Sequence, residues 1–179
     1  MIHKRSESVI VLPHAPSWIL MYRHESRCIL DALRPGQPIA HHIGSTAIPI
    51  CFAKPIIDIL IEADNLSLVD ACNPMMQQLG YQIMGEYGIS NRRYFRKNSD
   101  TGDRLYHVHV FAKGDPSIER HLVFRDFLIQ HPTWAEKYSD LKRELATAHP
   151  NSSRHYTEAK TELVMLIDKL ASKWKEMQN

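Results

Sequence analysis

The sequence predicts an α+β fold in which a mixed β-sheet occupies about residues 9–112 and helices occupy about residues 115–177. Apolar and β-branched runs of strand length recur through the first two thirds of the chain, separated by turn-forming residues. After Gly114 the apolar residues adopt helical spacing up to the C-terminus. No linker or low-complexity segment divides the chain, so residues 1–179 are expected to form a single domain.

The composition is that of an ordinary globular protein, with 44% hydrophobic and 23% charged residues. Lys and Arg number 22 against 20 Asp and Glu, which gives a formal charge of +2 and no extended basic track for nucleic acid. No apolar run reaches the roughly 20 residues that span a bilayer, and the charged N-terminus lacks a secretory signal. We therefore expect a cytoplasmic protein that binds neither nucleic acid nor a membrane.

The first two thirds of the chain contain both strand and helix patterns. Strands are expected at residues 9–12, 39–43, 55–62, 81–84, 93–97 and 105–111. Helices are expected at residues 17–33 and 65–79, where apolar residues repeat at helical spacing. The last two strands are joined by a turn-forming stretch, which predicts an antiparallel hairpin.

The C-terminal third is predicted to contain three helices. The first begins at Asp115 and Pro116, because proline suits the first helical position, and runs to about Gln130. A T-x-x-E capping box at Thr133 and Glu136 predicts the start of the second, which ends near residue 148. The last covers residues 153–176 as one amphipathic helix. Its expected apolar stripe consists of Tyr156, Leu163, Leu166, Leu170 and Trp174.

A Gly-Ser pair follows the predicted strand at 39–43. Glycine allows an anion to approach the backbone closely, so Gly44, Ser45 and Thr46 could bind phosphate through N–H groups and hydroxyls. Such pairs are also common in ordinary turns, which leaves a purely structural role open.

Asp58 interrupts an isoleucine-rich strand. A carboxylate there costs several kcal/mol unless it is paired, bound to a metal or placed at the open face of the sheet. Asp58 is therefore a candidate catalytic or metal-binding residue, with pairing to a core arginine as the alternative. Glu62 lies on the same strand face but roughly 13 Å away, too far for both carboxylates to bind one ion.

Histidines occur in two of the predicted strands. His107 and His109 share one strand face, with backbones about 6.6 Å apart, so their rings could converge on a metal or phosphate. Hydrogen bonding within a polar sheet face is the alternative. Only one of the adjacent His41 and His42 can reach a given face, and His42 is the candidate metal ligand.

Basic residues accompany these candidates. Lys54, Arg93 and Arg96 are candidate phosphate ligands, since arginine can bind phosphate through two nitrogens. Solvation on an exposed hairpin is the alternative for the two arginines.

The charged residues of the predicted C-terminal helices are expected to have structural roles. Lys142 and Arg143 are interpreted as part of a solvated face. Arg125, with Asp126 and His131, is expected to brace the helices against the sheet domain.

Six segments together resemble the GrpB family. They are HIGSTAIP, AKPIIDI, YHVHVF, HLVFRDFLIQHP, YSDLKRELA and YTEAK. The resemblance covers about residues 13–171 and implies a nucleotidyltransferase-like core, in which Gly44 and Ser45 match the Gly-Ser element of that superfamily and Asp58 matches a carboxylate of its Asp-x-Asp pair. The family usually has Pro-Gly-Leu before Ala-Lys-Pro, whereas Ile50 stands here in place of the glycine.

The resemblance leaves three functions open. One is metal-assisted nucleotidyl or phosphoryl transfer, in which Asp58, His42, His107 and His109 hold Mg, Mn or Zn. That enzyme would lack the first carboxylate of the pair, because Ile56 cannot bind a cation, whereas two-metal chemistry needs carboxylates that hold ions about 3.5–4 Å apart. The second is a noncatalytic module that binds a nucleotide or coenzyme A-related ligand, since family members occur fused to dephospho-coenzyme A kinase. The third is an interaction protein whose groove is vestigial.

Overall fold

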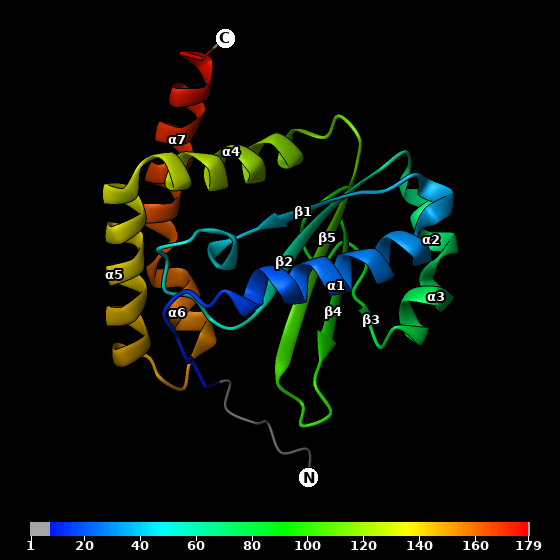
Figure 1. Cartoon of the computed structure of the whole chain (residues 1–179), viewed down its shortest axis with the longest axis horizontal. Helices are drawn as coiled ribbons and strands as arrows, with labels where there is room; N and C mark the ends of the chain where they lie inside the picture. The colour runs from blue at the N-terminus through cyan, green and yellow to red at the C-terminus, as the bar shows by residue number, and fades with distance from the viewer. Residues whose placement is uncertain (1–7, 179) are drawn as a thin grey trace.

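The computed structural model describes residues 8–178, which contain a mixed five-stranded sheet of order β1-β2-β5-β4-β3 (Figure 1). Its strands are β1 (Ile39–Ile43), β2 (Ile57–Ala63), β3 (Gln82–Ile83), β4 (Arg93–Asn98) and β5 (Arg104–Ala112). β2 and β5 run parallel, and the other neighbouring pairs are antiparallel, including the expected β4–β5 hairpin. The predicted α+β class is confirmed.

Helices pack on the sheet and beside it. Those of the first part are α1 (Ser17–Ala32), α2 (Leu66–Ala71), α3 (Asn73–Gln78) and the 3-10 turns η1 (Arg34–Gly36) and η2 (Ser45–Ala47). The C-terminal helices are α4 (Pro116–Gln130), α5 (Pro132–Ala148), α6 (Ser153–Ala159) and α7 (Thr161–Glu176). In Figure 1, α1 crosses the front of the sheet, whereas α5, α6 and α7 stand to its left. None of the helices within residues 8–178 is long and apolar enough to cross a membrane.

One face of the sheet is apolar and packs against α1. Ile57, Ile59 and Ile61 alternate along β2 and lie in this core with no exposed surface. Full burial of an isoleucine side chain contributes about 1.5–3 kcal/mol, which explains why β2 is the central, most apolar strand. His42 lies on this face, because the register pairs it with Ile59, and its ring stacks on Tyr22 with centroids 4.7 Å apart.

The opposite face is apolar at one end and polar at the other. Ile43, Leu60 and Phe111 pack beneath Ile118 of α4. Arg125 of α4 donates a hydrogen bond of 3.0 Å to the carbonyl of the β1 residue 42, so it braces this helix against the sheet as expected. Asp58 belongs to the polar end of this face.

In the first part of the chain, the structure differs from the prediction at two elements. Residues 9–12 form no strand but a single bridge between Leu12 and Ala53, because Pro13 has no N–H to extend a ladder. The helix expected at 65–79 is split into α2 and α3 at Cys72, where Pro74 occupies the first turn of the second helix.

Two further differences lie in the C-terminal third. α5 begins at Pro132 and its N-cap, His131, makes no side-chain cap, so the predicted capping box falls inside the first turn. His131 instead stacks on Phe127, with centroids 4.2 Å apart. The expected last helix is two, α6 and α7, which meet at Lys160. The break shifts the buried stripe, so Leu166 is 45% exposed.

Candidate functional site

A cleft of about 630 Å³ lies between the polar end of the second sheet face and the helices α5 and α6. Residues on the sheet side include Ser45, Lys54, Asp58, Arg96, Arg104 and His107. Residues on the helix side include Lys142, Ser153, Tyr156 and Lys160. This volume is within the range of small-molecule sites, so the cleft is the candidate functional site.

Asp58 and the two strand histidines form the polar centre of the sheet side. The parallel register pairs Asp58 with His107, so both side chains project from the same face. Asp58 Oδ1 lies 3.1 Å from Nδ1 of His107 and 3.9 Å from Nε2 of His109. Burial alone would raise the pKa of Asp58, but the hydrogen bonds and charges of both histidines outweigh it and hold that pKa well below its ordinary value. The carboxylate is therefore ionised.

Two arginines contact the far nitrogens of these histidines. Nη1 of Arg104 lies 3.4 Å from Nε2 of His107, and Nη1 of Arg92 lies 3.3 Å from Nδ1 of His109. A guanidinium only donates, so each contacted nitrogen is placed to accept a hydrogen bond, and the other nitrogen of each ring faces Asp58. Burial, together with the positive charge of Arg92, lowers the pKa of His109, although the Asp58 carboxylate opposes this shift.

Of the four predicted metal ligands, the structure brings Asp58, His107 and His109 together, and His42 does not join them. His42 lies on the other face of the sheet, where its Nε2 is 2.9 Å from the hydroxyl of Thr46. Within residues 8–178, no three His, Cys, Asp or Glu side chains are grouped to hold a metal ion.

The Gly44 turn lies against Asp58. Gly44 has φ +70° and ψ −172°, and a Cβ on it would lie 2.6 Å from Oδ2 of Asp58. Ser45 follows in η2 and lines the cleft. Thr46 also lines it, but its side chain is buried and its hydroxyl is in contact with His42. The structure thus brings Gly44 and Ser45 to the predicted carboxylate.

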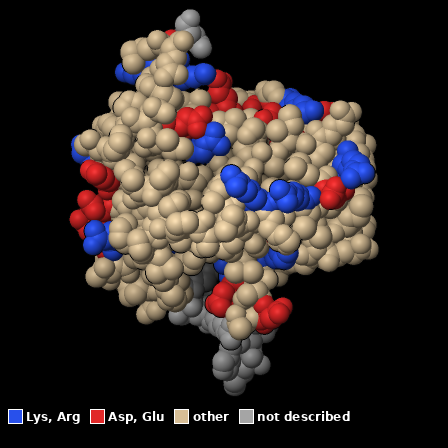
Figure 2. Space-filling model, in the orientation of Figure 1, with Lys and Arg blue, Asp and Glu red and all other residues tan. Residues whose placement is uncertain are grey.

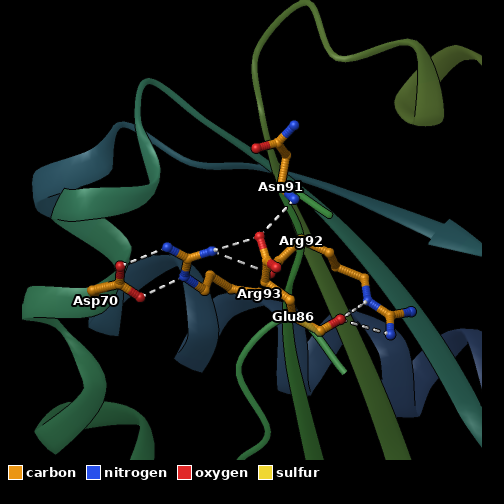
Figure 3. A network of polar contacts seen from close by, with 5 residues as sticks. All are labelled: Asp70, Glu86, Asn91, Arg92 and Arg93. Carbon is orange, nitrogen blue, oxygen red and sulfur yellow. Dashed lines mark hydrogen bonds and ion pairs between the residues drawn. The ribbon is translucent and has the colours of Figure 1, made fainter. Parts of the chain in front are cut away.

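Of the predicted basic ligands, Lys54 and Arg96 line the cleft and Arg93 does not. Nζ of Lys54 donates a hydrogen bond of 2.8 Å to Ser153 Oγ. Arg96 donates one of 2.7 Å to the side chain of Gln82. Arg93 projects from the opposite strand face and makes two hydrogen bonds, of 2.6 and 2.8 Å, to the carboxylate of Asp70 (Figure 3). This pairing removes Arg93 from the candidate site.

Lys142 of α5 is a cleft residue that the sequence analysis assigned to a solvated face, and that assignment is wrong. Its side chain is 2% exposed, and its Nζ has no nitrogen or oxygen hydrogen-bond partner among residues 8–178; the neighbouring Cys51 thiol only partly offsets the effect of burial on its pKa. The ammonium lies 4.2 Å from the centroid of the Tyr138 ring, and burial lowers its pKa to about 8. Its spacing from the buried Ala135 and Tyr138 follows the helical repeat, which is the pattern that could have revealed its burial.

Two more lysines lie close to the Tyr156 ring of α6. Lys54 Nζ is 4.7 Å and Lys160 Nζ is 5.3 Å from its centroid. The positive charge of Lys160 contributes to the lowered pKa of Lys142. We call Lys54, Lys142 and Lys160 the lysine cluster. By contrast, basic and acidic side chains are interspersed on the surface shown in Figure 2.

The fold of the chain is similar to the fold of nucleotidyltransferase polymerase cores. The chain is similar to a chain of the GLD-2/RNP-8 complex, with TM-score 0.55, 11% identity and coverage of 83% of this chain and 51% of that one. It is also similar to the polymerase core of TRAMP, an RNA surveillance complex, with TM-score 0.50, 12% identity and coverage of 86% and 50%. The family model described as GrpB protein matches residues 8–170, and the chain belongs to this family.

Three further proteins are more similar to this chain in sequence. The crystal structure of the conserved protein GrpB from Enterococcus faecalis has TM-score 0.87 and 36% identity, and the match covers 93% of this chain and 99% of that one. The protein YqkA of Bacillus subtilis is 39% identical over 176 residues, which are 98% of this chain and 50% of YqkA. A dephospho-CoA kinase of Mycobacterium leprae is 26% identical over 191 residues, covering 89% of this chain and 45% of the kinase. The chain thus spans half or less of these two longer relatives.

Proposed function

We propose that the protein binds a phosphorylated small molecule, a nucleotide or coenzyme A-related compound, in the cleft, with the phosphates at the lysine cluster. The observation that carries this proposal is Lys142, a 2% exposed ammonium without an anionic partner or a nitrogen or oxygen hydrogen-bond partner among residues 8–178. A buried charge is costly unless it is paired, and an anion in the cleft would supply the missing partner.

The neighbourhood of Lys142 favours more than one phosphate group. Lys54 and Lys160 lie near the same Tyr156 ring, so three ammonium groups are concentrated along one side of the cleft. Their mutual repulsion falls when a polyanion binds, which favours di- and triphosphates over monophosphates. Ser45 and Arg96, across the cleft, are available to the rest of such a ligand.

Calorimetric titration tests this proposal. The probes are inorganic triphosphate, ATP and dephospho-coenzyme A, each with and without Mg, Mn or Zn. We expect binding to the wild type and at least tenfold weaker binding to Lys142→Met. Lys137→Met, on the exposed part of the same helix, is the matched control and should bind as the wild type does. The proposal is refuted if no probe binds the wild type, or if Lys142→Met binds like the wild type.

A second candidate function is transfer of a phosphoryl or nucleotidyl group from this ligand. The position of Asp58 favours it, because the ionised carboxylate lines the same cleft as the lysine cluster and could accept a hydrogen bond from an acceptor hydroxyl. Ile56 and Leu60, two residues away on either side, provide no second carboxylate. The test is release from ATP, with water or an added alcohol as the acceptor, of ADP (phosphoryl transfer) or pyrophosphate (nucleotidyl transfer) by the wild type, and loss of that product in Asp58→Asn with ATP binding retained. Binding without any product would support a noncatalytic module instead.

A further inference from the structure

The loop between β3 and β4 carries an exposed aromatic side chain into the cleft region. Tyr87 is 59% exposed and lines the cleft. Its φ of +45° is unusual for a residue with a side chain, and Gly85, Gly88 and Asn91 of the same loop also have positive φ. A backbone of this kind persists only where its surroundings hold it.

Arg92 holds this loop in place. Its side chain is 6% exposed, and its guanidinium donates hydrogen bonds of 3.1 and 3.2 Å to the carbonyl of Glu86 and of 2.9 Å to the carbonyl of Tyr87. The Glu86 carboxylate accepts a hydrogen bond of 2.8 Å from the backbone of Asn91 and lies 4.0 Å from Arg93 (Figure 3). Arg92 also contacts His109, so one buried residue links the loop to the histidine beside Asp58.

The Tyr87 ring is already stacked on one side. Its centroid lies 5.3 Å from that of Tyr94, with an angle of 29° between the planes. Tyr94 is buried, and its ring lies 5.2 Å from His109 and 5.7 Å from His107. Tyr87 is therefore the outermost ring of an aromatic cluster that also contains Tyr94 and the two histidines of the polar centre, and it leaves most of its own surface uncovered.

We propose that Tyr87 is a stacking platform for a planar heteroaromatic ring of the cleft ligand, which makes that ligand a nucleotide or a nucleotide-containing coenzyme. This inference rests on the proposed function, since it places the ring at Tyr87 while the phosphates occupy the lysine cluster of the same cleft. Stacking of a base on an aromatic side chain strengthens binding by roughly tenfold or more and tolerates different bases. Arg92 is a positioning residue that fixes the loop.

Calorimetry with two probes separates this inference from the proposed function. Inorganic triphosphate contains phosphates without a ring, whereas ATP contains both. In the wild type, ATP should bind at least tenfold more tightly than triphosphate. Tyr87→Ala should lose this advantage while its affinity for triphosphate stays unchanged, and Tyr87→Phe should keep the advantage. The exposed Ile89 provides a matched control in the same loop, and Ile89→Ala should bind both probes like the wild type.

Each contrary outcome has a distinct meaning. If triphosphate binds but ATP binds no more tightly, or if Tyr87→Ala retains the advantage of ATP, the stacking inference is overturned and the phosphate site stands. If none of triphosphate, ATP and dephospho-coenzyme A binds the wild type, the proposed function itself fails. Retained triphosphate binding by Tyr87→Ala also demonstrates that the variant folds.

Discussion

Gly44 lies so close to Asp58 that the carboxylate leaves no room for a side chain on Gly44. An ideal Cβ on Gly44 would be 2.6 Å from Oδ2 of Asp58 and 3.2 Å from its Cβ and Cγ. The backbone of Gly44, at φ +70° and ψ −172°, also belongs to a region that residues with a side chain rarely adopt. The turn that presents Ser45 to the cleft and the carboxylate of β2 are therefore packed as one unit.

This contact predicts the effect of a methyl group at Gly44. Gly44→Ala should lower the free energy of unfolding by about 2–4 kcal/mol, because backbone strain and the collision with Asp58 add together. Chemical denaturation at neutral pH measures this loss. Gly114→Ala is the matched control, since Gly114 has φ +86° but open space where a Cβ would be. Equal losses in both variants would show that the Asp58 contact contributes nothing.

Lys142 should destabilise the unliganded protein. Burial lowers its pKa from 10.5 to about 8, so the folded state disfavours the charged form. Lys142→Met should raise the free energy of unfolding at pH 7 by about 1–3 kcal/mol, although it weakens binding of triphosphate. In the wild type, the free energy of unfolding should rise as the pH increases from about 8, because the folded protein loses the proton of Lys142 while the unfolded chain still retains it.

Denaturation of both proteins between pH 7 and 10 checks this trade-off. The advantage of Lys142→Met should shrink as the pH rises and the wild-type ammonium loses its proton. A variant that is less stable than the wild type at pH 7 would indicate that the ammonium already has a stabilising partner.

The strand and helix pattern of this chain was largely predictable, because apolar periodicity is a local property. The strand at Asp58 and the helices α1 and α4 show this. The breaks at Cys72 and Lys160 were not found, since the apolar spacing continues across each of them. The order of the strands depends on contacts between distant segments, which no local pattern contains.

The cleft was predictable in part. Period-two alternation correctly placed His107 and His109 on one face, and the pairing of that face with Asp58 came from the parallel register. Arg93 and Arg96 are three residues apart on one strand, so alternation sends them to opposite faces and only Arg96 reaches the cleft. Lys142 was missed because its charge was given more weight than its position on the apolar stripe of its helix.

His42 predicts a loss of stability in mild acid. Burial lowers the pKa of His42 from 6.5 to about 4, so the unfolded chain binds a proton that the folded protein does not. Above pH 6.5, His42 is neutral in both states and its titration does not affect the free energy of unfolding. As the pH falls from 6.5 toward 4, protonation of His42 in the unfolded chain lowers the free energy of unfolding by about 2–4 kcal/mol. In denaturation at pH 7 and pH 5, His42→Phe should show a smaller difference than the wild type. The exposed His24 supplies the control, and His24→Gln should behave like the wild type.

The arginine contacts predict opposite tautomers for the two histidines beside Asp58. Nitrogen-15 NMR should find the proton of His107 on Nδ1 and that of His109 on Nε2, because Arg104 and Arg92 donate to the other nitrogens.

Arg104→Met should release His107 from this constraint and alter its nitrogen shifts while those of His109 stay the same. Added Zn or Mg should leave the wild-type shifts unchanged, because no three His, Cys, Asp or Glu side chains among residues 8–178 are grouped to hold a metal ion. A zinc-dependent change at His107 and His109 together would instead restore the metal site that the sequence suggested, with Asp58 as the third ligand.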